Sequence, residues 1–301
     1  MTGTRQVRPD ASPRTTLDKA AHENFPVAPF FLPRAWRDDL MAVYGYARLV
    51  DDIGDGDLAP GGADARHLGA EGETDRLALL DAFEADLRRV FDGTPSHPLL
   101  RALRPTVRRH ALTPEPFLAL IEANRQDQKV RRYETFDDLV AYCELSANPV
   151  GRLVLDITGT TSPERLRRSD AICTALQIVE HLQDVAEDLA HDRIYLPAVD
   201  MKRFHVTEAD LARPTGGASV RALVAFEADR ARRLLDDGAP LVGSVRGRLR
   251  LLLAGFAGGG HAALDAITAA GYDVLPGPPR ATRPNLMRAV AAVLRSARGE
   301  G

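Results

Sequence analysis

The chain of 301 residues lacks the features that would place it in several common protein classes. It has only two cysteines, Cys143 and Cys173, both inside predicted helices, so nothing indicates a disulfide scaffold or a cysteine zinc site. Its net charge is only −3, which provides neither the basic surface that binds nucleic acid nor a polybasic patch for anionic lipid. We therefore expect no nucleic-acid partner.

Long apolar runs and familiar catalytic sequences are also missing. The most apolar stretch, Leu251 to Ala257, is far shorter than the roughly 18 residues of a membrane span. Walker A, H-E-x-x-H and G-x-S-x-G sequences do not occur. The glycine-rich run at residues 255–260 follows a helix rather than a strand, so we interpret it as a helix break instead of a phosphate loop.

Helical spacing dominates the rest of the chain and predicts an all-α protein. Residues 1–16 are polar and lack the apolar core of a signal peptide, so we expect a disordered tail, one domain over residues 17–301 and a cytoplasmic location. Residues 56–74 are predicted to form a long flexible loop. The predicted helices cover residues 34–55, 75–91, 99–109, 114–128, 136–158, 163–190, 220–238, 246–271 and 285–298.

Two acidic segments, at residues 51–55 and 184–188, supply carboxylates that could bind metal ions. In each, the outer aspartates are four residues apart, so on a helix their side chains lie on the same side. Two such faces looking at each other across a helical bundle would bind divalent cations and, through them, a diphosphate. We call these the first and second acidic segments.

The first acidic segment continues a helical stripe of Leu40, Tyr44 and Ala47, which predicts that Asp51 faces the core. Buried carboxylates need a compensating cation. That cation is either a metal ion or Arg48, which lies one turn earlier and could form an ordinary Arg–Asp pair at the helix end.

The second acidic segment extends a stripe that begins at Gln177 and Glu180 and contains no lysine or arginine. Like charges four residues apart repel by about 0.2–0.5 kcal/mol each. A solvated helix face is one interpretation of this stripe, and Mg²⁺ held by carboxylates together with substrate phosphate is the other. The isolated histidines His22 and His181 could be ligands, but such residues are more often structural.

Five segments in order resemble the squalene/phytoene synthase family of head-to-head prenyl transferases, over roughly residues 20–297. They are HENFPV (22–27), YGYARLVDDIGD (44–55), RYETFDDLVAYC (132–143), SANPVG (146–151) and QIVEHLQDVAEDLAHDRIYLP (177–197). HENFPV and SANPVG look like the hopanoid-pathway branch of this family. The resemblance implies an all-α isoprenoid-synthase fold with a central cavity.

The resemblance also implies roles for individual residues. Mg²⁺ and diphosphate would be held by Asp51, Asp52, Asp55, Glu180, Asp184, Glu187 and Asp188. Catalysis would involve Tyr44, Arg48, Tyr142 and Gln177. The substrate would further contact His22, Asn24, Phe25, Ala147, Asn148, Arg193 and Tyr195. The chain departs from the family pattern at Glu180, where many relatives have asparagine, and at Gly260-His261, where a tyrosine is common.

The implied reaction is the Mg²⁺-dependent conversion of presqualene diphosphate and water to hydroxysqualene and diphosphate, with no nucleotide cofactor. Condensation of two farnesyl diphosphates to presqualene diphosphate or squalene is the nearest alternative. An inactive helical binding protein is an alternative from a different class. The expected partners are the prenyl diphosphate and other squalene- or hopanoid-pathway enzymes. Because the product is very apolar, we also expect the protein to contact a membrane peripherally.

Overall fold

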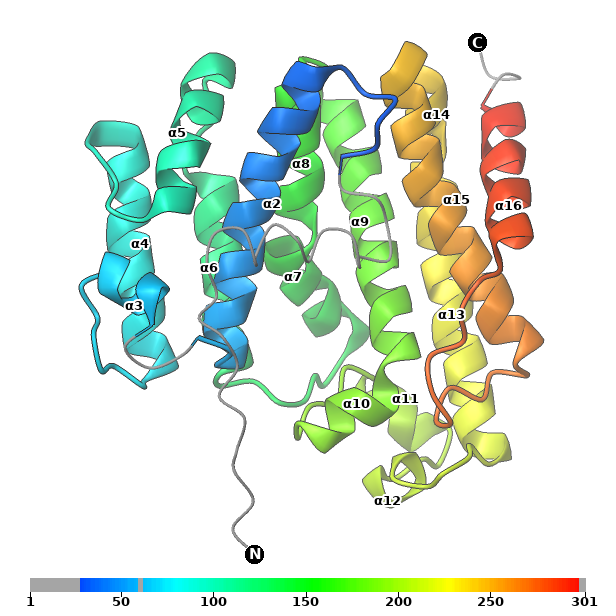
Figure 1. The fold of residues 1–301 in the computed structure, drawn as a ribbon. Coiled ribbons are helices and arrows are strands. Elements are labelled where there is room, and N and C mark those ends of the chain that lie inside the picture. The colour runs from blue at the N-terminus through cyan, green and yellow to red at the C-terminus, as the bar shows by residue number, and fades with distance from the viewer. Residues whose placement is uncertain (1–27, 59–61, 298–301) are drawn as a thin grey trace, which may run out of the picture. The chain divides into compact units, whose positions relative to one another are not determined.

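The computed structural model describes residues 28–58 and 62–297. Helices account for the regular structure of these ranges, which contain an isolated Arg132–Ile194 bridge but no strand, so the all-α prediction is confirmed (Figure 1). The described chain forms two compact units, here called unit 1 (Arg34–Gln128) and unit 2 (Pro29–Pro33 and residues 129–297). The expectation of a single domain stays a prediction. The predicted tail and the site residues His22, Asn24 and Phe25 lie outside the described residues.

Unit 1 contains helices whose apolar faces meet around a small aromatic core. Tyr46 stacks on Phe83, with ring centroids 5.4 Å apart, and its hydroxyl donates to the Phe117 carbonyl at 2.7 Å. Helix α2 packs against α4, α5 and α6. The helices of unit 1 are α2 (Arg34–Asp55), α3 (Ala63–His67), α4 (Arg76–Asp92), α5 (Pro98–His110) and α6 (Glu115–Asp127).

Unit 2 is organised around α9, which packs against α7, α8, α13, α14 and α15. Helix α16 lies along α15 at one side of this unit (Figure 1). The helices of unit 2 are α7 (Phe136–Ser146), α8 (Asn148–Ile157), α9 (Pro163–Gln183), α10 (Val185–Ala190), α11 (Ala198–Arg203), α12 (Glu208–Leu211), α13 (Ala218–Gly238), α14 (Pro240–Ser244), α15 (Gly247–Ala269) and α16 (Arg283–Ser296).

Several predicted helix boundaries are wrong. The helix expected over residues 136–158 breaks at Ala147, and the one expected over residues 163–190 breaks at Asp184. The loop expected over residues 56–74 contains the short helix α3. The Asp64 carboxylate of this helix lies 3.0 Å from the ring of the buried His97, and this contact attaches the helix to the rest of unit 1.

The helix break expected at residues 255–260 is also wrong, since α15 is continuous through this run. Its glycines allow close packing: a Cβ on Gly258 would lie 2.7 Å from the Val290 backbone of α16. Among the described helices, α15 alone is long and apolar enough to cross a membrane, although 56% of its most apolar stretch is buried within the protein.

Candidate active site

The first acidic segment lies at the end of α2, within unit 1, and its carboxylates occupy different environments. Asp52 is only 2% exposed and accepts a hydrogen bond from Arg48 Nε at 2.8 Å. An Arg–Asp pair at the helix end is therefore present, but the carboxylate that Arg48 contacts in it is that of Asp52. Asp51 and Asp55 are exposed.

The predicted core-facing stripe of α2 is confirmed at Leu40, which is buried, but is wrong further along the helix. Its core-facing residues are Val43, Tyr46, Val50 and Ile53, whereas Tyr44 and Ala47 are half-buried and Asp51 is exposed. Both sets have helical spacing, and the larger apolar volume of the first set places that face in the core. Tyr44, Arg48 and Asp51 consequently share the less buried side of α2.

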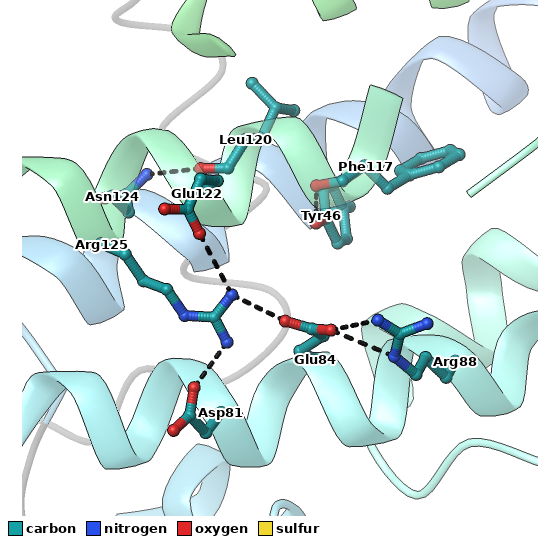
Figure 2. A network of polar contacts seen from close by, with 9 residues as sticks. All are labelled: Tyr46, Asp81, Glu84, Arg88, Phe117, Leu120, Glu122, Asn124 and Arg125. Carbon is teal, nitrogen blue, oxygen red and sulfur yellow. Dashed lines mark hydrogen bonds and ion pairs between the residues drawn. The ribbon is translucent and has the colours of Figure 1, made fainter. Parts of the chain in front are cut away.

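Helix α6 holds the end of α2 in place. Asn124 Nδ2 donates to Asp51 Oδ1 and to the Leu120 carbonyl, both at 3.2 Å, and Gln128 Nε2 donates to the Gly54 carbonyl at 3.0 Å. Arg125, the residue after Asn124, forms ion pairs with Asp81 and Glu84 of α4, as Figure 2 shows. The first acidic segment is thus hydrogen-bonded to the α6 region, which ion pairs in turn connect to α4.

Desolvation by the surrounding protein raises the pKa of Asp51 to about 7, and the negative charges of Asp55 and Asp52 add to this rise. The Asn124 hydrogen bond and the charge of Arg48 act in the opposite direction. Asp51 as a whole residue remains exposed, so a cation can approach it from solvent. A cation at Asp51 would relieve the repulsion that disfavours its ionised form.

The second acidic segment follows a local break in unit 2. Asp184 separates α9 from α10, with φ −106° and ψ 15°, but the Asp188 N–H still donates to the Asp184 carbonyl at 2.8 Å. Burial raises the pKa of Asp184, and Asp188 and Glu187 raise it further. Glu180 and Glu187 are exposed. The predicted acidic stripe is therefore divided between two helices.

Tyrosines and a histidine gather beside the second acidic segment. The His181 and Tyr195 rings are stacked, with centroids 3.6 Å apart, and Tyr142 lies 5.6 Å from Tyr195. Tyr133 stacks on the Tyr195 ring at 5.6 Å. Backbone hydrogen bonds bring this cluster together, because Ile194 donates to the Arg131 carbonyl and Ala198 to the Tyr133 carbonyl, both at 2.9 Å.

The remaining predicted substrate residues of unit 2 surround this cluster. Gln177 Nε2 lies 3.2 Å from His181 Nε2, and the Arg193 backbone N–H donates to the Asp188 carbonyl at 2.8 Å. Asn148 is buried and accepts a hydrogen bond from Thr174 of α9 at 3.0 Å, so its side chain carries a structural contact. Ala147 caps α7 and is half-buried.

Sequence reasoning missed two residues near the second acidic segment. For His181 the sequence left a ligand and a structural role open, and the structure shows that it contacts the aromatic cluster and lies 3.9 Å from Asp188. Arg280 is close enough to Asp184 for its charge to lower the pKa of that carboxyl. The Pro- and Gly-rich segment around Arg280 offers no helical period that would reveal this proximity.

The residues present fit Mg²⁺. The Asp188 Oδ2 atom is buried and has no hydrogen-bond partner among the described residues, which suits a carboxylate that binds a cation. No group of three or more His, Cys, Asp or Glu side chains forms a preassembled metal site within residues 28–58 and 62–297. Mg²⁺ does not need one, since it commonly uses one or two carboxylates with substrate phosphates and water. That the two acidic segments face each other stays a prediction.

Known proteins resemble this chain over most of its length. Residues 19–287 match the squalene/phytoene synthase family model. A hydroxysqualene synthase of Zymomonas mobilis is 38% identical over 217 residues, or 71% of this chain and 67% of that protein. A 15-cis-phytoene synthase of Synechococcus elongatus is 32% identical, covering 70% of this chain and 68% of that protein.

Solved structures agree with these sequence matches. Squalene synthase HpnC from Alicyclobacillus acidocaldarius has 44% identity and a TM-score of 0.75, covering 85% of this chain and 92% of that one. A dehydrosqualene synthase with a bound ligand has a TM-score of 0.80 at 22% identity, covering 95% of this chain and 96% of that one, and supports the fold alone. The predicted isoprenoid-synthase fold is thereby confirmed, and the chain belongs to the squalene/phytoene synthase family.

Proposed function

We propose that the protein converts presqualene diphosphate and water to hydroxysqualene and diphosphate, with Mg²⁺ as its cofactor and no nucleotide. The observation that carries this proposal is the buried, unpartnered Asp188 oxygen next to the Tyr142–Tyr195 aromatic cluster. A cation-binding carboxylate and a wall of aromatic rings are the two elements that diphosphate ionisation requires. The 38% identical hydroxysqualene synthase supports the choice of reaction.

The first step breaks the C–O bond between the substrate carbon and the diphosphate. Bound Mg²⁺ would neutralise the diphosphate charge as this bond breaks. Asp51, Asp55, Asp184 and Asp188 would hold the metal, and Asp52 would keep Arg48 in place through their 2.8 Å contact.

The second step guides the cyclopropylcarbinyl cation to a single product. The buried rings of Tyr142 and Tyr195 would form an aromatic surface beside the cation and keep bulk water away. After the cyclopropylcarbinyl rearrangement, the oxygen of one water molecule forms a C–O bond, and its proton is lost to solvent. Hydroxysqualene and diphosphate leave.

Condensation of two farnesyl diphosphates is the second candidate reaction. The match to phytoene synthases at 32–33% identity supports a reaction other than hydroxysqualene formation, because those relatives are named for a different product. In either case we propose a cytoplasmic enzyme of the squalene and hopanoid pathway. Its apolar product would be passed on at a peripheral membrane contact or to other enzymes of that pathway.

The two reactions are separated by supplying each diphosphate with Mg²⁺, with and without NADPH, and identifying products by mass spectrometry. We expect presqualene diphosphate to yield hydroxysqualene that carries ¹⁸O when the reaction runs in H₂¹⁸O. Consumption of farnesyl diphosphate with presqualene diphosphate left untouched would refute the proposed reaction. A helical binding protein without catalytic activity would instead consume neither diphosphate, and Asp51→Asn and Asp184→Asn would leave its binding function intact.

A further inference from the structure

His181 has no role in the function proposed above, although it sits at the centre of the unit 2 site. It lies on α9, three residues before the break at Asp184, and its side chain is only 11% exposed. A buried polar ring in such a place needs polar partners for both nitrogens. The identity of those partners gives His181 a specific task.

The first partner is the Gln177 side chain, one helical turn earlier. Gln177 Nε2 lies 3.2 Å from His181 Nε2. The Gln177 amide is thus within hydrogen-bond distance of one ring nitrogen, and Nδ1, on the other side of the ring, remains for a different partner. Nδ1 faces the otherwise unpartnered Asp188 Oδ2 at 3.9 Å. The imidazole therefore connects an amide to a carboxylate of the second acidic segment.

The second partner is the Tyr195 ring. It stacks on the imidazole at 3.6 Å between centroids, with an angle of 10° between the two planes. Tyr195 is itself packed between Tyr133 and Tyr142, so a shift of the imidazole would move the whole aromatic cluster. One side chain thus contacts the amide, the carboxylate and the aromatic wall.

We propose that His181 is a positioning residue that fixes the Gln177 amide and the Tyr195 ring relative to Asp188. This inference rests on the proposed function, which places those three side chains at the substrate. It predicts that His181 affects turnover and the distribution of products more than substrate affinity, since it does not itself touch the diphosphate. Misplacing reactive groups by about 1 Å lowers rates by as much as about 100-fold.

The test compares His181→Phe, His181→Gln and the control His110→Phe. Phenylalanine keeps a ring against Tyr195 but removes both nitrogens, and glutamine restores a polar atom within reach of Gln177. His110 is a partly buried histidine of α5 in unit 1 that lies 2.8 Å from Asp39 and has no contact with the aromatic cluster among the interactions of the described residues. Its loss should lower the melting temperature without altering the products.

For His181→Phe we expect kcat to fall about 10- to 100-fold, KM to change less than about threefold, and the ratio of alcohol to other terpenoid products to shift. His181→Gln should recover part of the rate. The inference fails if His181→Phe leaves the product ratio unchanged, or if its kcat falls no further than that of His110→Phe.

The proposed function is judged separately on the wild type. If the wild type uses farnesyl diphosphate but not presqualene diphosphate, the proposed reaction is wrong, and the same three variants test His181 in the farnesyl diphosphate reaction. If it consumes neither substrate, both proposals fail.

Discussion

Asn124 shows how one side chain of α6 orients a carboxylate of α2. Its amide nitrogen donates to Asp51 and to the Leu120 carbonyl, and these two hydrogen bonds fix the direction of the NH₂ group. Gly54 provides the space, because a Cβ at that position would overlap the Asn124 amide oxygen. The geometry of Asp51 therefore depends on two residues that carry no charge.

Asn124→Ala should weaken Mg²⁺ use. Loss of one hydrogen bond worth about 1 kcal/mol corresponds to an increase of about fivefold in the Mg²⁺ concentration that gives half-maximal activity. Activity measured across a Mg²⁺ titration tests this, with Asn285→Ala on α16 as the control. Identical Mg²⁺ dependence in wild type and Asn124→Ala would contradict the assignment.

Glu227 should make the stability of the protein depend on pH. It is 1% exposed, and burial raises its pKa to about 7 from a usual value of 4.5. The positive charge of Arg230, 3.1 Å away, lowers this pKa but does not offset the effect of burial. The folded state thus binds this proton more tightly than the unfolded state. The resulting contribution is fully present below the unfolded pKa and is lost as the pH rises through the folded pKa.

Glu227→Gln removes this titration. We expect its melting temperature, relative to wild type, to rise between pH 5 and pH 8, by about 2–4 °C for each kcal/mol of difference. Thermal denaturation of both proteins over that range is the measurement. A difference in melting temperature that stays constant with pH would show that Glu227 titrates normally.

At the scale of elements, the two helix breaks at the site differ in whether the local sequence signals them. Pro149 disfavours helical geometry at Asn148, just after the break at Ala147, so this break has a local signal. No proline or glycine flanks Asp184. There, the neighbouring Gln183 side chain donates to the Pro279 carbonyl, a contact over almost a hundred residues that no local pattern contains.

Helix α15 offers a test of close helix packing within unit 2. Gly258→Ala would place a Cβ 2.7 Å from the Val290 backbone of α16, and such overpacking costs about 1–3 kcal/mol. Gly255→Ala, three residues earlier, would meet nothing within 4 Å and should stabilise the helix by up to about 1 kcal/mol. Denaturant unfolding of both variants checks the prediction, which fails if the two substitutions change stability in the same direction.

At the scale of the whole molecule, each unit carries one acidic segment. Mg²⁺ with a non-reacting diphosphate analogue should therefore raise the melting temperature of the wild type. Ligand at about 100 times its Kd adds about 2.7 kcal/mol of stability. Asp51→Asn and Asp184→Asn should each reduce this shift, as measured by differential scanning fluorimetry.

The double variant shows whether the two segments act on one diphosphate. If they do, Asp51→Asn with Asp184→Asn should lose little more of the thermal shift than either single variant. Independent sites would instead give additive losses. A thermal shift that survives in both single variants would contradict the metal assignment.

The sequence by itself determined the helical class, the family and the positions of both acidic segments, because helical period and motif spacing are local properties. It did not determine which side of α2 is buried, since two stripes had suitable spacing and only packing against α4, α5 and α6 selected one. The ring partners of His181 likewise come from Tyr142 and Tyr195, on separate segments. Periodicity specifies which residues share a face, whereas only the tertiary structure decides what covers that face.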